Sequence, residues 1–320
     1  MAGPHGMLRD GLREPAFVVR VWSMTLPKIL IFGRVGQVGW ELRHKLACLG
    51  PVTSVGSPEI DFARPDTIRN AICAVQPSVI VNAAAYTAVD KAEAAPEAAW
   101  AINAAGPEVI AEEARRLGAL LIHYSTDYVY DGSKQGPWVE TDAPNPLNVY
   151  GKTKLAGDQA IAAVGGDYLI LRTSWVYGPR GGNFLLTMLR LAKERPVLRI
   201  VDDQTGSPTT SECIAQATAQ ILAQVTAPGH GLDGRSGVYH LTSSGQTTWF
   251  GFAKQFLSKQ PVCPALTPIP SSEYPVPAKR PANSVLCCQR LRETFGVRMP
   301  SWEGSLDLVL ETLAEGEAKP

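Results

Sequence analysis

The strongest constraint on the fold is a glycine-rich turn that joins a short apolar run to a helix. Residues 28–32, KILIF, are typical of a buried parallel strand, and residues 37–50 carry apolar side chains at helical spacing. Between them, GRVGQVG contains Gly33, Gly36 and Gly39. Glycine permits positive φ and lets backbone N–H groups approach a pyrophosphate at a helix N-terminus. This order predicts a dinucleotide-binding βαβ unit, and a tight turn without a nucleotide stays open as the alternative.

Apolar runs and helical segments continue to alternate along the chain as far as about residue 178. Such alternation predicts an α/β fold, a Rossmann-type doubly wound parallel sheet covered by helices on both faces. After residue 178 the rhythm becomes irregular, and the prolines clustered at 261–281 exclude a central strand or a long helix there. We expect a dinucleotide-binding domain over 24–178 plus about 206–245, and a smaller C-terminal substrate-binding domain over about 179–205 plus 246–320.

The composition limits the classes of partner. The chain has 320 residues, and 30 basic residues balance 30 acidic ones. Such a chain has no general field for nucleic acid or an anionic membrane, and no apolar run approaches the about 20 residues of a membrane span. The six cysteines lack CxxC or zinc spacing, which favours reduced thiols in a cytoplasmic protein. Residues 1–23 do not resemble a signal peptide, and we expect a disordered extension, with an upstream start that the cell does not use as the alternative.

The cofactor preference is predicted from the glycine turn and from the end of the second strand. Gly56 and Ser57 stand where an NAD-specific protein usually has a carboxylate, and Arg34 in the turn can meet a 2′-phosphate. The sequence therefore favours NADPH, with NADH as the alternative. The cofactor-binding candidates are Gly33, Arg34, Gly36, Gln37, Val38, Gly39, Asp61, Phe62, Ala83, Ala84, Ala85, Tyr150 and Lys154.

A tyrosine and a lysine in the segment NVYGKTKLAG (148–157) are the candidates for proton transfer. Tyr150 and Lys154 stand four residues apart, on one face of a helix. A phenol normally titrates near about 10, and a nearby ammonium lowers that pKa, so the phenol can protonate a carbonyl oxygen as hydride arrives. A bare YxxxK is more often plain helix surface. Thr126, however, ends a strand at the sheet edge where ligands bind, and its hydroxyl can orient a substrate oxygen.

Eight segments between about 28 and 286 resemble the dTDP-4-dehydrorhamnose reductase family, within the extended short-chain dehydrogenases/reductases. They are ILIFGRVGQVGWEL, VIVNAAAYTAVDKAE, HYSTDYVYDG, ETDAPNPLNVYGKTKLAGD, LRTSWVYG, NFLLTMLRLAKE, VDDQTGSPT and RPANSVL, in family order. YTAVDKAE and NPLNVYGKTKLAG separate this family from most sugar-nucleotide epimerases and dehydratases. One mild departure is Asp158, where the family has glutamate.

The resemblance implies reduction of the 4-keto group of dTDP-4-dehydro-β-L-rhamnose to dTDP-L-rhamnose by a cytoplasmic homodimer. It implies that Thr126, Tyr150 and Lys154 form the catalytic triad, and that magnesium is bound through Glu41, Glu212 and Glu311. The implied substrate-binding residues are Val89, Asp90, Thr126, Asp127, Tyr128 and Trp175, and Arg280 in AKRPANS is our candidate for the diphosphate. Plain helix caps, core packing or a solvated basic turn stay open as alternatives for Asp90, Asp127, Trp175 and Arg280.

Two other functions stay open. The first is an epimerase or dehydratase of the same fold that retains its NAD. A dehydratase needs an extra acid beside the sugar, and no glutamate follows Asp127, which disfavours this alternative. The second is a non-catalytic regulatory subunit of reductase-like fold that binds NADP(H), in which the triad can survive.

Overall fold

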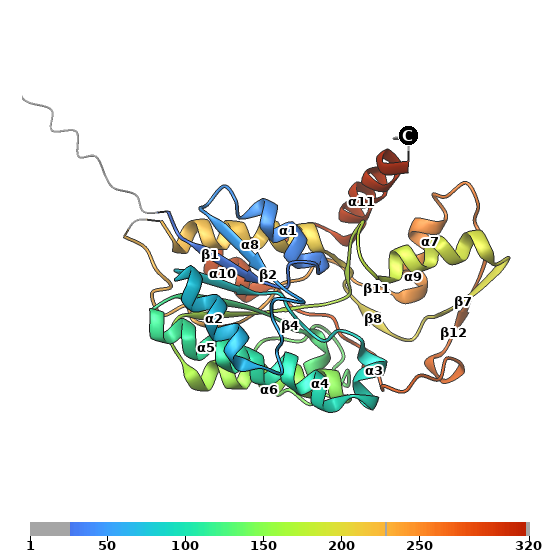
Figure 1. The fold of residues 1–320 in the computed structure, drawn as a ribbon. Helices are drawn as coiled ribbons and strands as arrows, with labels where there is room; N and C mark the ends of the chain where they lie inside the picture. The colour runs from blue at the N-terminus through green and yellow to red at the C-terminus, as the bar shows by residue number, and fades with distance from the viewer. Residues whose placement is uncertain (1–25, 228, 318–320) are drawn as a thin grey trace, which may run out of the picture.

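A parallel sheet of six strands forms the centre of the larger part of the molecule (Figure 1). The computed structural model describes residues 26–227 and 229–317, so the extension predicted at 1–23 lies outside the described residues. In spatial order the strands are β2 (Val52–Val55), β1 (Ile29–Phe32), β3 (Val79–Asn82), β4 (Leu120–Thr126), β5 (Tyr168–Thr173) and β10 (Gly237–His240). The chain order reverses between β1 and β3, and such sheets bind ligands beyond the carboxyl ends of the strands at this point.

The central strands are buried on both faces, because an apolar core lies on each side of the sheet. All residues of β1, β3 and β4 are buried, and each strand pairs with its neighbours in parallel. Continuous apolar runs such as ILIF and VIVN suit this position, since neither face of the strand meets water. The predicted α/β fold with a doubly wound parallel sheet is confirmed.

Helices cover the sheet on both sides (Figure 1). One apolar core lies under α1 (Gln37–Lys45), α8 (Ser211–Val225) and α10 (Gln289–Phe295). The core on the opposite face lies under α2 (Pro65–Val75), α5 (Gly106–Leu117) and α6 (Val149–Val164). The helix α10 falls within the predicted smaller domain, yet its Leu291 and Phe295 join the core of the large sheet. Their spacing of four residues places both on one helix face, which covers this side of the sheet.

A π-helical turn interrupts the long helical segment that follows β3. This segment consists of α3 (Val89–Ala94), α4 (Pro96–Trp100), the π-turn Ala101–Ala105 and α5. Asn103 in the π-turn is fully buried and accepts a hydrogen bond from the Tyr86 backbone N–H at 2.9 Å. Its amide also donates to Thr153 Oγ1 at 3.1 Å. The π-turn therefore joins the loop after β3 to the helix that carries Tyr150, and single π-turns often mark functional sites.

The smaller lobe is built from short paired strands and three helices. Its elements are β6 (Val176–Tyr177), α7 (Phe184–Glu194), β7 (Val197–Val201), β8 (Thr205–Gly206), β9 (Thr209–Thr210), β11 (Thr247–Thr248), α9 (Trp249–Leu257), β12 (Ala265–Ile269) and α11 (Trp302–Glu317). Two short 3₁₀ turns, Asp127–Val129 and Ser271–Glu273, complete the described elements. Buried Leu185, Phe252, Phe256 and Leu306 belong to one separate apolar core of this lobe. None of the helices described within 26–227 and 229–317 has the length and apolarity to cross a membrane.

Candidate active site

A cleft of about 520 Å³ gathers most of the predicted site residues. Its walls come from the turn after β1, the loop after β3, the carboxyl ends of β4 and β5, and the first turns of α6. These segments meet because parallel strands present all their carboxyl ends at one edge of the sheet. The predicted residues among the lining are Gly36, Gln37, Val38, Ala83, Ala85, Val89, Thr126, Asp127, Tyr128, Tyr150, Lys154 and Trp175.

The glycine turn is shaped for close approach of backbone. Gly33 has φ +101°, and a Cβ there would lie 2.7 Å from the carbonyl carbon of Ala83. A Cβ on Gly39 would lie 2.0 Å from the Gly33 carbonyl oxygen, so both positions require glycine. The helix α1 then begins with no side chain capping its first turn. Its free N–H groups and its dipole suit the pyrophosphate of a dinucleotide, so the residues present fit a nicotinamide cofactor.

Arg34 lies beside the end of β2. Its backbone N–H donates to the Val55 carbonyl at 3.1 Å, and its guanidinium forms an ion pair of 2.9 Å with Glu59. Gly56 follows β2 and lies against Arg34, close enough that an added Cβ would be 3.4 Å from the backbone nitrogen of Arg34. The guanidinium of Arg34 thus lies near the position where NAD-specific proteins have a carboxylate, and its ion pair with Glu59 partly neutralises its charge.

Besides Gly33, Arg34 and Gly39 of the glycine turn, three more predicted cofactor residues lie outside the lining of the cleft. Asp61 accepts a hydrogen bond from the Ala63 N–H at 3.0 Å and shapes the turn before α2. Phe62 packs edge-on against Phe32, with ring centroids 6.3 Å apart. Ala84 donates its N–H to Asn82 Oδ1 at 3.2 Å. These contacts lie within the protein, and the cofactor role of the three residues stays a prediction.

Tyr150 and Thr126 both line the cleft. The Thr126 hydroxyl donates to Asp127 Oδ1 at 3.0 Å and accepts from the Tyr128 N–H at 3.2 Å. Burial raises the pKa of Tyr150 to about 12, and the Thr126 hydroxyl only partly opposes this. The expected lowering of this pKa by Lys154 is not found, because desolvation of the phenolate dominates and the lysine nitrogen bonds elsewhere.

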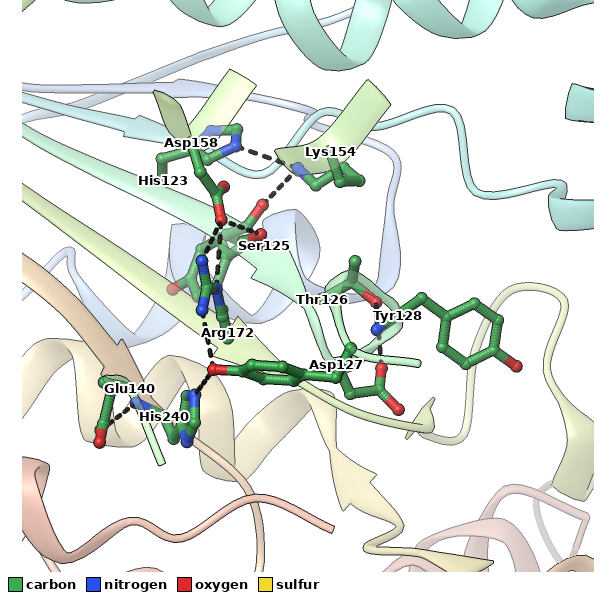
Figure 2. Close-up of polar contacts among 12 residues, drawn as sticks. His123, Ser125, Thr126, Asp127, Tyr128, Glu140, Lys154, Asp158, Arg172 and His240 are labelled. Carbon is green, nitrogen blue, oxygen red and sulfur yellow. Dashed lines mark hydrogen bonds and ion pairs between the residues drawn. The ribbon is translucent and has the colours of Figure 1, made fainter. Parts of the chain in front are cut away.

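Lys154 is buried beneath the cleft, with only 1% of its surface exposed. Its Nζ donates to the Tyr124 carbonyl oxygen at 2.6 Å and lies 3.0 Å from His123 Nε2 (Figure 2). Burial lowers the pKa of Lys154 to about 8, against the opposing effect of the Asp158 carboxylate. Sequence reasoning missed His123, because it stands three residues before Thr126 in the chain and has no motif of its own.

A buried ion pair lies next to the lysine (Figure 2). Asp158 Oδ2 accepts from Arg172 Nε at 3.2 Å and from the Ser125 hydroxyl at 2.8 Å. Arg172 also donates to the Tyr130 hydroxyl at 2.8 Å, which lies 2.9 Å from His240 Nε2. Burial raises the pKa of Asp158, and Arg172 is the largest opposing influence. The aspartate at this position is thus part of a hydrogen-bonded charge network under the site.

Asp90 and Arg280, two predicted substrate residues, form an ion pair with each other. Arg280 Nη2 lies 2.8 Å from Asp90 Oδ2, and Asp90 Oδ1 also accepts from the Ala278 N–H at 3.2 Å. The guanidinium therefore lowers the pKa of Asp90. Arg280 also lines a second cavity, of about 690 Å³, in the smaller lobe. The ion pair with Asp90 thus holds Arg280 at the wall of this cavity.

The other predicted substrate residues line the cleft itself. Burial raises the pKa of Asp127 to about 7, while the hydroxyls of Ser284 and Thr126 lower it. The Tyr128 ring packs edge-on against Tyr150, with centroids 5.9 Å apart. An acid with a pKa near neutrality beside hydroxyl groups such as those of Thr126 and Tyr150 is a common feature of active sites.

Trp175 has an unusual backbone and an aromatic partner. Its φ is +46°, a left-handed conformation that is costly for a bulky residue and often found at functional sites. Its ring stacks on Trp249, with centroids 3.5 Å apart and planes inclined by 5°. Trp249 lines both the cleft and the second cavity, and sequence reasoning missed it. The segment TTWF reads as the capped start of a helix, and only the tertiary fold shows which cavities the ring meets.

The three glutamates implied for magnesium do not form one cluster in the described chain. Glu212 accepts a hydrogen bond from Lys45 at 2.6 Å. Burial raises the pKa of Glu41, and the charge of Glu212 raises it further. Glu311 lies on the exposed side of α11. Within 26–227 and 229–317 no group of three His, Cys, Asp or Glu residues could hold a metal ion. The magnesium site stays a prediction.

Comparisons with known proteins all indicate the same family. A family model described as RmlD substrate binding domain matches residues 27–315. A dTDP-4-dehydrorhamnose reductase of Burkholderia thailandensis is 48% identical over 294 residues, covering 89% of this chain and 99% of that relative. One from Escherichia coli K12 is 45% identical over 296 residues, covering 89% and 97%. The crystal structure of dTDP-4-dehydrorhamnose reductase from Bacillus anthracis in complex with NADP has a TM-score of 0.83 at 32% identity, covering 90% of this chain and 99% of that one.

Proposed function

We propose that this chain, which belongs to the dTDP-4-dehydrorhamnose reductase family, reduces the 4-keto group of dTDP-4-dehydro-β-L-rhamnose to give dTDP-L-rhamnose. The observation that carries the proposal is the meeting of Thr126, Tyr150 and Lys154 in one cleft with the uncapped start of α1. A proton donor, a charged neighbour and an anion-binding helix terminus are the parts that reduction of a ketone by a dinucleotide needs.

The side chains of the cleft account for the proton part of the reduction. When bound, a nicotinamide cofactor supplies the hydride for carbon 4 of the sugar. Tyr150 keeps its proton at neutral pH, since burial raises its pKa to about 12. A developing alkoxide is a stronger base than a phenolate and takes this proton. Thr126 orients the keto oxygen, and Lys154 holds the ribose of the cofactor.

We infer that NADPH is the preferred reductant. Arg34 places a cation at the end of β2, and neither Gly56 nor Ser57 offers a carboxylate there. A guanidinium binds phosphate oxygens through charge-assisted hydrogen bonds, which a 2′-hydroxyl cannot match. The NADP in the Bacillus anthracis relative supports the same choice.

The dTDP-sugar is proposed to span the two cavities. Val89, Asp127, Tyr128 and Trp175 line the cleft and are placed to meet the sugar. Arg280 lines the second cavity together with Lys279, where two cations suit the diphosphate. The shared wall at Trp249 joins both cavities and supports one continuous ligand path.

Three further expectations stay predictions: a homodimer, a magnesium ion at Glu41, Glu212 and Glu311, and a cytoplasmic location. The two competing functions can be separated by activity. Relatives at 45% and 48% identity carry the reductase name, which disfavours an epimerase or dehydratase. A regulatory subunit would bind the cofactor without consuming it.

A coupled assay tests the proposal. dTDP-glucose is first converted to the 4-keto-rhamnose derivative by the two preceding enzymes, and NADPH absorbance is followed after this protein is added. We expect consumption that needs both the ketosugar and this protein, and that disappears when Tyr150 is replaced by Phe. Tight NADPH binding with no consumption would instead support the regulatory-subunit alternative.

A further inference from the structure

Three buried polar side chains form a row behind the cleft. Asn82 ends β3, His123 is its directly paired neighbour in β4, and Lys154 comes from α6. Asn82 Nδ2 lies 3.0 Å from His123 Nδ1, and His123 Nε2 lies 3.0 Å from Lys154 Nζ. None of the three is more than 1% exposed, so water does not compete for these contacts. The ring therefore has one partner on each nitrogen, and their donor and acceptor roles must match.

The amide of Asn82 is oriented by the backbone. Its Oδ1 accepts the Ala84 N–H at 3.2 Å, so its NH₂ group faces the ring of His123. The reversed amide would place its NH₂ group against the Ala84 N–H, with two donors facing each other. Asn82 thus donates to His123 Nδ1, and this nitrogen must be an acceptor.

The ring then imposes a condition on the lysine. Burial lowers the pKa of His123 well below its ordinary value, and a charged Lys154 lowers it further, so the ring is neutral in either state of the amine and carries one N–H. With Nδ1 as the acceptor, that hydrogen is on Nε2 and points to Lys154 Nζ. An ammonium has donors only, whereas a neutral amine can accept this hydrogen while donating to the Tyr124 carbonyl. The observed orientations are all satisfied when Lys154 is neutral.

We propose that His123, oriented by Asn82, is a positioning residue that couples the proton count of Lys154 to the tautomer of its own ring. When the amine is neutral, the ring hydrogen is on Nε2. When the amine takes up a proton, the ring hydrogen moves from Nε2 to Nδ1, the Asn82 amide turns, and the hydrogen bond to Ala84 is lost. The ring gains no net proton in this change. The row opposes the ammonium form and holds Nζ in one place.

The charged and titratable groups around Lys154 set the range in which the change occurs. His123 and the Tyr124 carbonyl face the amine from β4, and Tyr150 and Asp158 lie on its own helix. Arg172 from β5 is bonded to Asp158 and weakens its effect. Burial outweighs the Asp158 carboxylate, and the pKa of Lys154 falls to about 8. The amine can therefore exchange its proton close to neutral pH, and the role of this exchange in catalysis rests on the proposed reductase function.

Nitrogen-15 NMR of the full chain, labelled at its five histidines, tests the inference without cofactor or sugar. The shifts of the two ring nitrogens distinguish the two neutral tautomers and the imidazolium. A His123→Gln variant assigns the signals. Between about pH 6 and about pH 10, a range that brackets the lysine titration, we expect His123 to pass from the Nδ1–H to the Nε2–H tautomer. The expected midpoint is about 8, the pKa of Lys154.

Two comparisons separate this coupling from a general effect of pH. His240 is also buried and bonds Tyr130 rather than a lysine, so its tautomer should not change in this range. In Lys154→Met, the His123 ring should stay as Nε2–H throughout. A single tautomer across the range in the unaltered protein, or a change that persists in Lys154→Met, would overturn the proposal. If Lys154→Met fails to fold, the titration of the unaltered protein decides. Because no turnover is measured, this result is independent of the coupled assay.

Discussion

The floor of the cleft and the wall of the second cavity hold their charged side chains in different surroundings. In the floor, Arg172 and Asp158 are only 5% and 3% exposed and lie on β5 and α6. At the second cavity, Arg280 is 21% exposed and its partner Asp90 38%. Arg280 belongs to an irregular segment between β12 and α10. Burial raises the pKa of Asp158, whereas the guanidinium of Arg280 lowers the pKa of the more exposed Asp90, where water screens the charges.

This difference suggests a division of labour. Proton transfer needs side chains whose positions are fixed and whose pKa values are set by their surroundings, and regular elements around a buried core provide both. Binding of a charged nucleotide needs cations that remain accessible to solvent and ligand. We therefore expect changes in the floor to affect turnover and folding, and changes at the second cavity to affect substrate affinity.

The largest expected effect is on turnover. Replacing Tyr150 with Phe removes only the donated proton, and general-acid groups contribute about 10²- to 10⁴-fold to rate. We expect kcat to fall by about this factor while NADPH affinity, measured by fluorescence titration, is retained. Tyr168→Phe is the matched control, because Tyr168 starts β5 outside the lining of the cleft. Near-normal turnover in Tyr150→Phe would remove Tyr150 from the role of acid.

The next effect is on stability. Asp158→Asn leaves Arg172 without its charged partner in a buried site, and breaking a buried pair costs about 3–5 kcal/mol of unfolding free energy. Urea denaturation measures the loss. Glu194→Gln breaks the exposed pair with Arg190 and should cost less than about 0.5 kcal/mol. Equal losses in the two variants would contradict the difference between floor and surface.

A change at the second cavity should appear in affinity instead. Arg280→Ala removes a charge-assisted hydrogen bond, worth about 1.5–3 kcal/mol, so the KM for the sugar nucleotide should rise about 10- to 100-fold. The kcat should change little, because Arg280 does not line the catalytic cleft. Steady-state kinetics with the ketosugar separate the two constants. A loss confined to kcat would assign Arg280 to the chemical step.

The smallest effect concerns the choice of cofactor. Arg34→Ala should weaken NADPH about tenfold and leave NADH nearly unchanged, since one charge-assisted contact to the 2′-phosphate is lost. Glu59→Gln removes the competing carboxylate and should strengthen NADPH binding. Dissociation constants for both cofactors, measured for both variants, test the prediction. Equal weakening of NADH and NADPH in Arg34→Ala would place Arg34 elsewhere than at the 2′-phosphate.

The features that could be predicted from the sequence are those encoded over a short stretch of chain. The glycine turn, the pair Tyr150 and Lys154 and the alternating apolar runs each occupy adjacent residues or one helical turn. The fold class was predicted correctly on this basis, and the family was predicted correctly from the eight segments that resemble it. The strict spacing of backbone and helix makes such patterns readable.

The features that were missed depend on sheet register and on lobe packing. His123 meets Asn82 across 41 residues and Lys154 across 31, because β3 and β4 are paired in one particular register. Trp249 meets Trp175 only when the smaller lobe packs against the cleft. The raised pKa of Tyr150 has the same origin, since burial is a property of the assembled core. None of these has a local sequence pattern.

The most direct test of the proposed function follows the transferred hydrogen. The ketosugar is reduced with NADPH that carries deuterium at the transferable position of the nicotinamide, and the dTDP-sugar product is examined by mass spectrometry and NMR. We predict dTDP-L-rhamnose with a single deuterium, at carbon 4 of the sugar. Product without deuterium at that carbon, or unchanged ketosugar in the presence of folded, NADPH-binding protein, would contradict the account.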